Sequence, residues 1–203
     1  MDLTLGDVLR IAAAPERHGR KPALIWGEGS FTYPELNASA NQAAHALLAM
    51  GLRKGDRVAV LARNCPEYVW LYFALAKLGA ILVPVNFWYR SGEIEYTLRQ
   101  SGTTTFLFDE RFRPQADEAT RAYGGVRHTI TWGGPSSDLT ERMASASAAE
   151  PEVRVAPSDH HIILYTSGTT GFPKGALFSQ RAHVLHALAW ALMTGQHEAD
   201  VGL

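Results

Sequence analysis

The sequence predicts an α/β fold in which helices cover both faces of a mostly parallel sheet. Segments with strand character alternate along the chain with segments of helical periodicity, and the connections between them are short. The predicted strands are continuous apolar runs, which is typical of strands buried on both faces. With 203 residues, of which 46% are hydrophobic, the chain is long enough to bury a sizeable core as one large or two small domains.

The first predicted elements are a short helix and a strand. The helix has one apolar face and ends at Pro15; that face consists of Leu5, Val8, Leu9 and Ala12. Residues 23–26 have the composition of a strand, and a turn at Glu28 and Gly29 follows it.

The second predicted helix has a complete start signal. Thr32 and Glu35 have the spacing of a capping box, and Phe31 and Leu36 are placed to form a hydrophobic staple around it. Gly51 ends the helix, whose buried stripe consists of Leu36, Ala40, Ala43, Ala44, Leu47 and Leu48. The pattern predicts an amphipathic helix packed on the sheet.

The centre of the chain alternates strands with helices. Strands are predicted over 57–62, 81–85, 104–108 and 129–132, and helices over 66–77, 91–100 and 111–123. Asn64 and Glu67 have the spacing of a capping signal for the helix 66–77, which ends at Gly79, and Gly102 ends the next helix. Because the helix 66–77 is apolar nearly all round, it must be covered on more than one side.

Residues 133–159 differ in composition from the segments before them. They are rich in Ser, Ala, Gly, Pro and charged residues, with few groups to bury. We expect an exposed connector with one helical turn near 139–144.

The composition argues against several classes of protein. A net charge of -1 gives no reason to expect a nucleic-acid footprint or a polybasic membrane anchor. The single cysteine, Cys65, cannot form an intrachain disulfide, which fits a reducing cytosol and a cytoplasmic location. The N-terminus lacks the pattern of a signal peptide, and the most apolar run, 68–76, is far shorter than the ~20 residues that span a bilayer.

Histidines and aromatic residues form two further groups of candidates. The pairs His160–His161 and His183–His186 suggest a metal site, but neighbouring strand residues point to opposite faces, and no cysteine or carboxylate cluster completes a ligand set. We expect these histidines to lie on the surface or in packing contacts. The aromatic run 87–89 is expected to pack beside a turn, with a stacking site for a substrate as the alternative.

The strongest functional signal lies between two apolar runs near the C-terminus. Hydroxyls from Thr166, Ser167, Thr169 and Thr170 accompany Lys174 and three glycines, Gly168, Gly171 and Gly175. Glycines that adopt positive φ angles align backbone N–H groups into a concavity, and hydroxyls and a lysine add donors and charge. The composition predicts a cradle for a di- or triphosphate; a hairpin that binds nothing is the alternative.

This loop differs from the Walker A pattern. In a P-loop a helix starts at the lysine and its N-terminus holds the phosphate. Here Pro173 precedes Lys174 and Gly175 follows it. We therefore expect a strand after Lys174, a helix from about Ser179, and phosphate contacts made by loop amides.

Residues 165–175, YTSGTTGFPKG, resemble the phosphate-binding signature of the adenylate-forming enzymes, which include acyl-CoA synthetases, peptide-synthetase adenylation domains and luciferases. Residues 31–36, 63–67 and 75–86 are similar to early segments of that family. Asn86 favours the acyl-CoA synthetase, or fatty-acid–CoA ligase, branch over peptide-synthetase domains. The resemblance implies that residues 1–203 form the amino-terminal part of the large adenylation (AMP-binding) domain, with the phosphate-binding loop at 166–175.

The resemblance implies a two-step reaction. A carboxylic acid of the fatty class reacts with ATP to give an acyl-adenylate and pyrophosphate, and the acyl group then passes to coenzyme A. The phosphate contacts implied are those of Thr166, Ser167, Gly168, Thr169, Thr170, Gly171, Lys174 and Gly175. Lys174 takes a catalytic role, and Thr166 contacts Mg²⁺.

Members of the family are more than twice as long as this chain. The segments for the acyl pocket, the adenine and ribose contacts and the adenylation lysine are not in the sequence. We expect the chain to be inactive alone and to associate with itself through surface that the remaining segments would cover. The alternative is a non-catalytic nucleotide-binding or interaction module from a truncated gene.

Overall fold

The computed structural model describes the chain except for residues 1, 19, 135–136, 167–172, 198–199 and 201–203. Its main sheet has six strands in the order β6-β5-β3-β4-β7-β8. Their bounds are β3 (Arg57–Leu61), β4 (Ile81–Val85), β5 (Thr105–Asp109), β6 (His128–Trp132), β7 (His160–Thr166) and β8 (Lys174–Ser179). The first five are parallel and β8 is antiparallel to β7, so the predicted fold class is confirmed.

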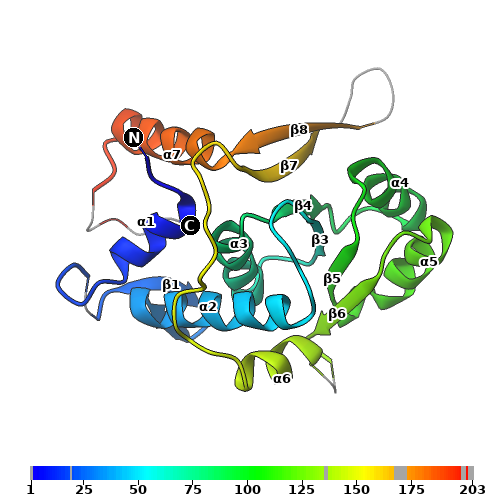
Figure 1. Cartoon of the computed structure of the whole chain (residues 1–203), viewed down its shortest axis with the longest axis horizontal. Coiled ribbons are helices and arrows are strands. Elements are labelled where there is room, and N and C mark those ends of the chain that lie inside the picture. The colour runs from blue at the N-terminus through cyan, green and yellow to red at the C-terminus, as the bar shows by residue number, and fades with distance from the viewer. Residues whose placement is uncertain (1, 19, 135–136, 167–172, 198–199, 201–203) are drawn as a thin grey trace.

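Helices lie on both faces of this sheet (Figure 1). They are α1 (Leu5–Ala12), α2 (Tyr33–Ala49), α3 (Pro66–Leu78), α4 (Ser91–Ser101), α5 (Arg113–Tyr123), α6 (Asp138–Ala144) and α7 (Gln180–Thr194), with a 3-10 turn at Glu110–Phe112. A separate antiparallel hairpin, β1 (Pro22–Trp26) and β2 (Gly29–Thr32), connects α1 to α2.

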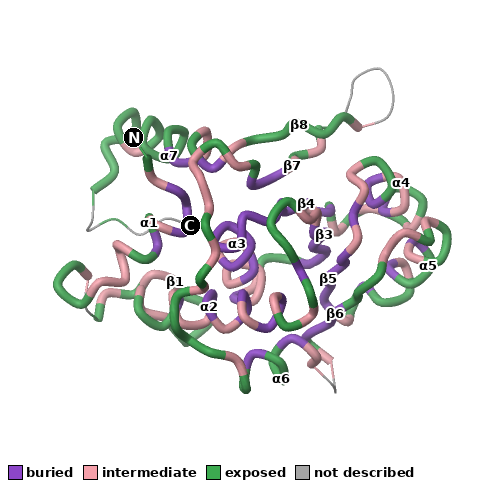
Figure 2. Tube along the Cα trace, in the orientation of Figure 1, coloured by how far each residue is buried: buried purple, intermediate pink, exposed green. Residues whose placement is uncertain are grey.

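Side chains of the central strand β3 alternate between two cores. Val58 and Val60 pack with residues of α2, α3 and α6, whereas Ala59 and Leu61 pack with residues of α4 and α5. All four side chains are fully buried. This two-sided burial explains why the strands are continuous apolar runs, and Figure 2 shows the buried residues concentrated in these strands and in α3.

The helix termini confirm one predicted capping signal and correct another. The backbone N–H of Thr32 donates to Glu35 Oε2 at 2.8 Å, and Thr32 Oγ1 accepts from the backbone N–H of Glu35, as a capping box requires. The prediction of Asn64 as a cap is wrong: Cys65 is the N-cap of α3 and makes no side-chain cap hydrogen bond. Pro66 begins α3 instead, because its fixed φ suits the first helical position and it has no N–H group to satisfy.

Gly79 and Gly102 end α3 and α4 as predicted, with φ angles of 62° and 66°. These left-handed angles favour glycine. In α1 the predicted apolar face is narrower than expected, because Leu5 and Leu9 are buried while Val8 is 40% exposed.

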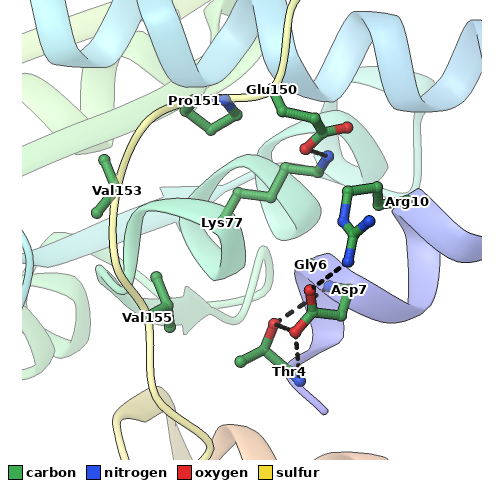
Figure 3. Close-up of a pocket in the computed structure, with 9 residues that line it drawn as sticks. All are labelled: Thr4, Gly6, Asp7, Arg10, Lys77, Glu150, Pro151, Val153 and Val155. Carbon is green, nitrogen blue, oxygen red and sulfur yellow. Dashed lines mark hydrogen bonds and ion pairs between the residues drawn. The ribbon is translucent and has the colours of Figure 1, made fainter.

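The segment 133–159 is largely exposed, but it contributes more to the core than its composition suggests. Its helix α6 buries Leu139 and Met143 in the cluster that also contains Trp132 and Leu47. Further along, Glu150 accepts a hydrogen bond from the buried Lys77 of α3 at 2.6 Å (Figure 3). The segment is therefore attached to α2 and α3 at two places.

Candidate phosphate-binding site

The β7–β8 hairpin brings two of the predicted phosphate contacts together. Thr166 ends β7 and Lys174 begins β8, and the two residues are register partners. Directly opposed residues of an antiparallel pair lie on the same face, so the hydroxyl and the ammonium group share one side of the hairpin. Both residues are exposed. The other predicted contacts, Ser167, Gly168, Thr169, Thr170 and Gly171, lie outside the described residues.

The element after Lys174 is a strand, as predicted. α7 begins at Gln180, where the Ser179 side chain accepts a hydrogen bond from the backbone N–H of Ala182 at 3.2 Å. Because no helix starts at the lysine, the arrangement differs from a P-loop.

Gly175 corrects one expectation. It does not have the positive φ angle that was expected of it; it lies in β8, opposite Tyr165. A Cβ atom placed there would come within 2.6 Å of Ile163 Cγ2 and 3.2 Å of Tyr165 Cζ. The position therefore favours glycine, because the side chains of Ile163 and Tyr165 occupy the space that a Cβ atom would need.

Helix α4 contacts this hairpin at β7 and just before β8, a relation that the sequence patterns did not predict. Tyr165 Oη donates to Gln100 Oε1, and Tyr96 Oη donates to the carbonyl oxygen of Pro173 at 3.0 Å. Burial raises the pKa of the Tyr165 phenol, so the group stays protonated and donates. The spacing of Tyr96 and Gln100, four residues apart on one helix face, is a signal too common to have been recognised.

A charged cluster lies at the carboxyl ends of β3, β4 and β5. The buried carboxylate of Asp109 accepts hydrogen bonds from the Arg111 side chain, and Arg63 lies over the ring of Phe87. Burial opposes the charge of Asp109, but the hydrogen bonds and positive charge of Arg111 bring its pKa below the usual value. In the aromatic run, Phe87 and Tyr89 pack against the core as expected, whereas Trp88 is 75% exposed.

The histidines agree with the packing prediction. His161 is fully buried, with ring centroids 4.8 Å from Tyr72 and 5.2 Å from His183. Across the described residues, no three His, Cys, Asp or Glu side chains are grouped to hold a metal ion. Cys65 is also a packing residue: it is partly buried against the core, and this burial raises the pKa of its thiol to about 11.

The pocket beside α1 has polar walls whose charged groups are already paired (Figure 3). It is lined by Thr4, Gly6, Asp7, Arg10, Lys77, Glu150, Pro151, Val153 and Val155. Arg10 pairs with Asp7, Thr4 caps α1 through Asp7, and Lys77 pairs with Glu150. The pocket is explained by attachment of the connector to α3.

In the described part of the chain, no helix is both long and apolar enough to cross a membrane.

Comparison with known proteins gives a consistent result. The sequence profile described as AMP-binding enzyme matches residues 11–202. Long-chain-fatty-acid–CoA ligase FadD13 of Mycobacterium tuberculosis is 41% identical over 161 residues, covering 79% of this chain and 32% of that protein. The fatty acid–[acyl-carrier-protein] ligase ScoC of Streptomyces coeruleorubidus is 36% identical, covering 79% of this chain and 30% of that protein.

Among solved structures, the N-terminal domain of FACL13 from Mycobacterium tuberculosis superimposes with a TM-score of 0.83 at 36% identity. The match covers 94% of this chain and 48% of that one. The chain spans about a third of the length of the curated relatives it matches. Profile, relatives and structure agree with the signature at 165–175, and the chain therefore belongs to the family of AMP-binding enzymes.

Proposed function

We propose that the chain carries the triphosphate-binding part of an ATP-dependent acyl-CoA synthetase. The observation that carries the proposal is the pairing of Thr166 with Lys174 on one face of the hairpin, on either side of the signature residues 167–172. A hydroxyl and an ammonium group at this spacing suit the oxygens of a polyphosphate. The substrate is a carboxylic acid of the fatty class, by analogy with the long-chain and acyl-carrier-protein ligases above.

The chemistry requires that negative charge on the departing pyrophosphate be stabilised as the carboxylate oxygen attacks the α-phosphorus atom. Donors that are already positioned lower this barrier more than donors that must reorganise. Lys174 would place its positive charge beside the leaving group. Thr166 and Ser167, the amides of Gly168 and Gly171, the hydroxyls of Thr169 and Thr170 and the backbone of Gly175 would hold the phosphate chain.

The residues present also fit Mg²⁺ as a companion of ATP. This ion keeps several waters and binds through substrate phosphates with only one or two protein ligands, so a group of carboxylates is not required. The Thr166 hydroxyl, exposed at the end of β7, would be its protein ligand. When bound, Mg²⁺ would neutralise part of the phosphate charge.

The acceptor of the acyl group is proposed to be coenzyme A. ScoC, whose acceptor is named as an acyl carrier protein, shows that relatives of similar identity differ in this respect. The proposal places the reaction in the cytoplasm, which supplies ATP and coenzyme A. It also treats the chain alone as inactive, because positioning dominates such catalysis and the chain covers only 32% of its ligase relative.

The test is an acid-dependent pyrophosphate-exchange assay with short, medium and long fatty acids and aromatic acids. It compares this chain alone with a chimera in which residues 1–203 replace the aligned segment of the mycobacterial long-chain ligase. We expect no exchange from the chain alone and exchange from the chimera. A folded chimera without activity, beside an active parent ligase, would contradict the proposal and favour a non-catalytic nucleotide-binding or interaction module.

A further inference from the structure

The loop end of the β7–β8 hairpin lies beyond its attachment to the parallel sheet. Within the described residues, β7 and β4 are register partners at one position, Leu82 with Ile162, while β7 itself continues to Thr166. Figure 1 shows the hairpin extending past β4, with α4 beneath its far end. Two strands that extend from a sheet need another support to hold their end in place, because an isolated hairpin is only marginally stable.

Helix α4 is suited to give that support. It is fixed to the core by Ile94 and Leu98, both fully buried, and it ends at a left-handed Gly102. From this fixed helix, Tyr96 and Gln100 make the hydrogen bonds to Pro173 and Tyr165 described above. Each bonded residue immediately precedes a proposed phosphate contact: Tyr165 precedes Thr166, and Pro173 precedes Lys174.

The two sets of residues lie on opposite sides of the hairpin. Tyr165 points to the core that contains α4, and successive strand residues alternate between faces, so Thr166 and Lys174 lie on the other face. Tyr96 and Gln100 thus contact the hairpin from behind the proposed phosphate site. We infer that Tyr96 and Gln100 are positioning residues, which hold the ends of β7 and β8 so that Thr166 and Lys174 keep their places against the phosphates.

The positioning role rests on the proposed function, but the anchoring of the hairpin by Tyr96 and Gln100 can be tested without ATP. Tyr96→Phe removes the hydroxyl and keeps the ring. Tyr123→Phe is the matched control, since Tyr123 lies on neighbouring α5 and its ring stacks with Arg99. In Tyr96→Phe, the amides of Lys174 to Ala176 should exchange hydrogen about fivefold faster than in the parent chain, which is the factor expected for the loss of one hydrogen bond. In Tyr123→Phe, exchange at these amides should equal that of the parent. The melting temperatures of both should stay within about 4 °C of the parent.

The second readout uses the chimera described above. Tyr96→Phe should raise the KM for ATP about fivefold and leave the KM for the fatty acid unchanged. A purely structural role would change both constants or neither. Unchanged exchange at the start of β8 would overturn the anchoring, and faster exchange with an unchanged KM for ATP would overturn the positioning role. An inactive parent chimera would instead count against the proposed function, while the exchange comparison still decides the anchoring.

Discussion

Gly175 shows how a single residue in the signature serves packing. Replacing it with alanine would place Cβ within 2.6 Å of Ile163 Cγ2, on a β-branched side chain with little freedom to move. We expect Gly175→Ala to lower the free energy of unfolding by about 1–3 kcal/mol, the usual cost of overpacking. Urea unfolding measures the difference. The control is Gly92→Ala, at an exposed site of α4 where no atom of the described residues lies within 4 Å of the added Cβ, and this change should be neutral or stabilising.

The proposed role of Lys174 is in function and not in stability. Its side chain is exposed at the start of β8, so Lys174→Ala should change the free energy of unfolding by less than about 0.5 kcal/mol. In the chimera, the same change should lower kcat for adenylation about 100-fold, because in the proposed reaction the charge stabilises the leaving pyrophosphate. Arg20→Ala, an exposed cation between α1 and β1, is the control for loss of one charge. A large loss of stability with an unchanged rate would mean that Lys174 is structural.

At the scale of elements, Lys77 joins three segments of the chain. Its ammonium group, on a side chain that is 4% exposed, donates to Asn37 Oδ1, Asn41 Oδ1 and Glu150 Oε2 at 2.7, 2.8 and 2.6 Å. Lys77→Met would leave the amide oxygen of buried Asn41 without this donor, so we expect a loss of about 2–4 kcal/mol in the free energy of unfolding.

Lys54→Met is the matched control for Lys77. Lys54 also pairs with a carboxylate of the same region, Asp159, at 2.6 Å, but its side chain is 43% exposed. Loss of an exposed pair should cost less than about 1 kcal/mol. Equal losses from the two variants would contradict the role given to the buried cluster.

The packing of α7 on β7 should depend on pH. Burial lowers the pKa of His161 from 6.5 to about 3, and the nearby His183 adds to the effect. The unfolded chain therefore binds a proton that the folded chain excludes, so stability present above pH 6.5 is lost progressively as the pH falls toward 3. From His161 alone we expect a loss of about 2 kcal/mol between pH 7 and pH 5.

Urea unfolding at both pH values measures this loss in the parent and in two variants. His161→Leu should be much less sensitive to pH, because leucine does not titrate. Among the described residues neither ring nitrogen of His161 has a hydrogen-bond partner, so the substitution breaks no hydrogen bond there. His160→Gln, at the exposed neighbouring position, should keep the sensitivity of the parent. An unchanged pH dependence in His161→Leu would assign the effect to other groups.

At the scale of the whole molecule, α7 carries exposed apolar side chains. Leu185, Leu188 and Leu192, spaced along one helix face, are 50%, 41% and 83% exposed, and Figure 2 shows this helix and β8 as mostly exposed. Surfaces of this kind associate in water. We expect concentration-dependent self-association in sedimentation velocity, abolished by the double change Leu188→Lys and Leu192→Lys.

The control for association is on the opposite end of the chain. Ile25→Lys and Trp26→Lys alter exposed apolar residues of β1, 56% and 50% exposed, and should leave association unchanged. A parent chain that stays monomeric up to high concentration would contradict the expectation for α7.

The sequence by itself determined the order and type of most elements, but not strand β2, and it determined the location of the signature. Strand runs such as 81–85, the capping box at Thr32 and Glu35 and the helix ends at Gly79 and Gly102 all depend on residues close together in the chain. Such local preferences can be read without knowing the fold. The N-cap of α3 is Cys65 and not the predicted Asn64. Both residues precede Pro66, so the local pattern does not decide which of them caps the helix.

Tertiary structure decided the relations between distant residues. The burial of Leu139 and Met143, the contacts of Lys77 with Glu150 and the space at Gly175 each depend on partners that only folding brings near. The same holds for Tyr165 and Gln100, which are separated by 65 residues. Local periodicity carries no information on such pairs. The packing of helices on the sheet decides which side chains meet, and the pattern within either element does not.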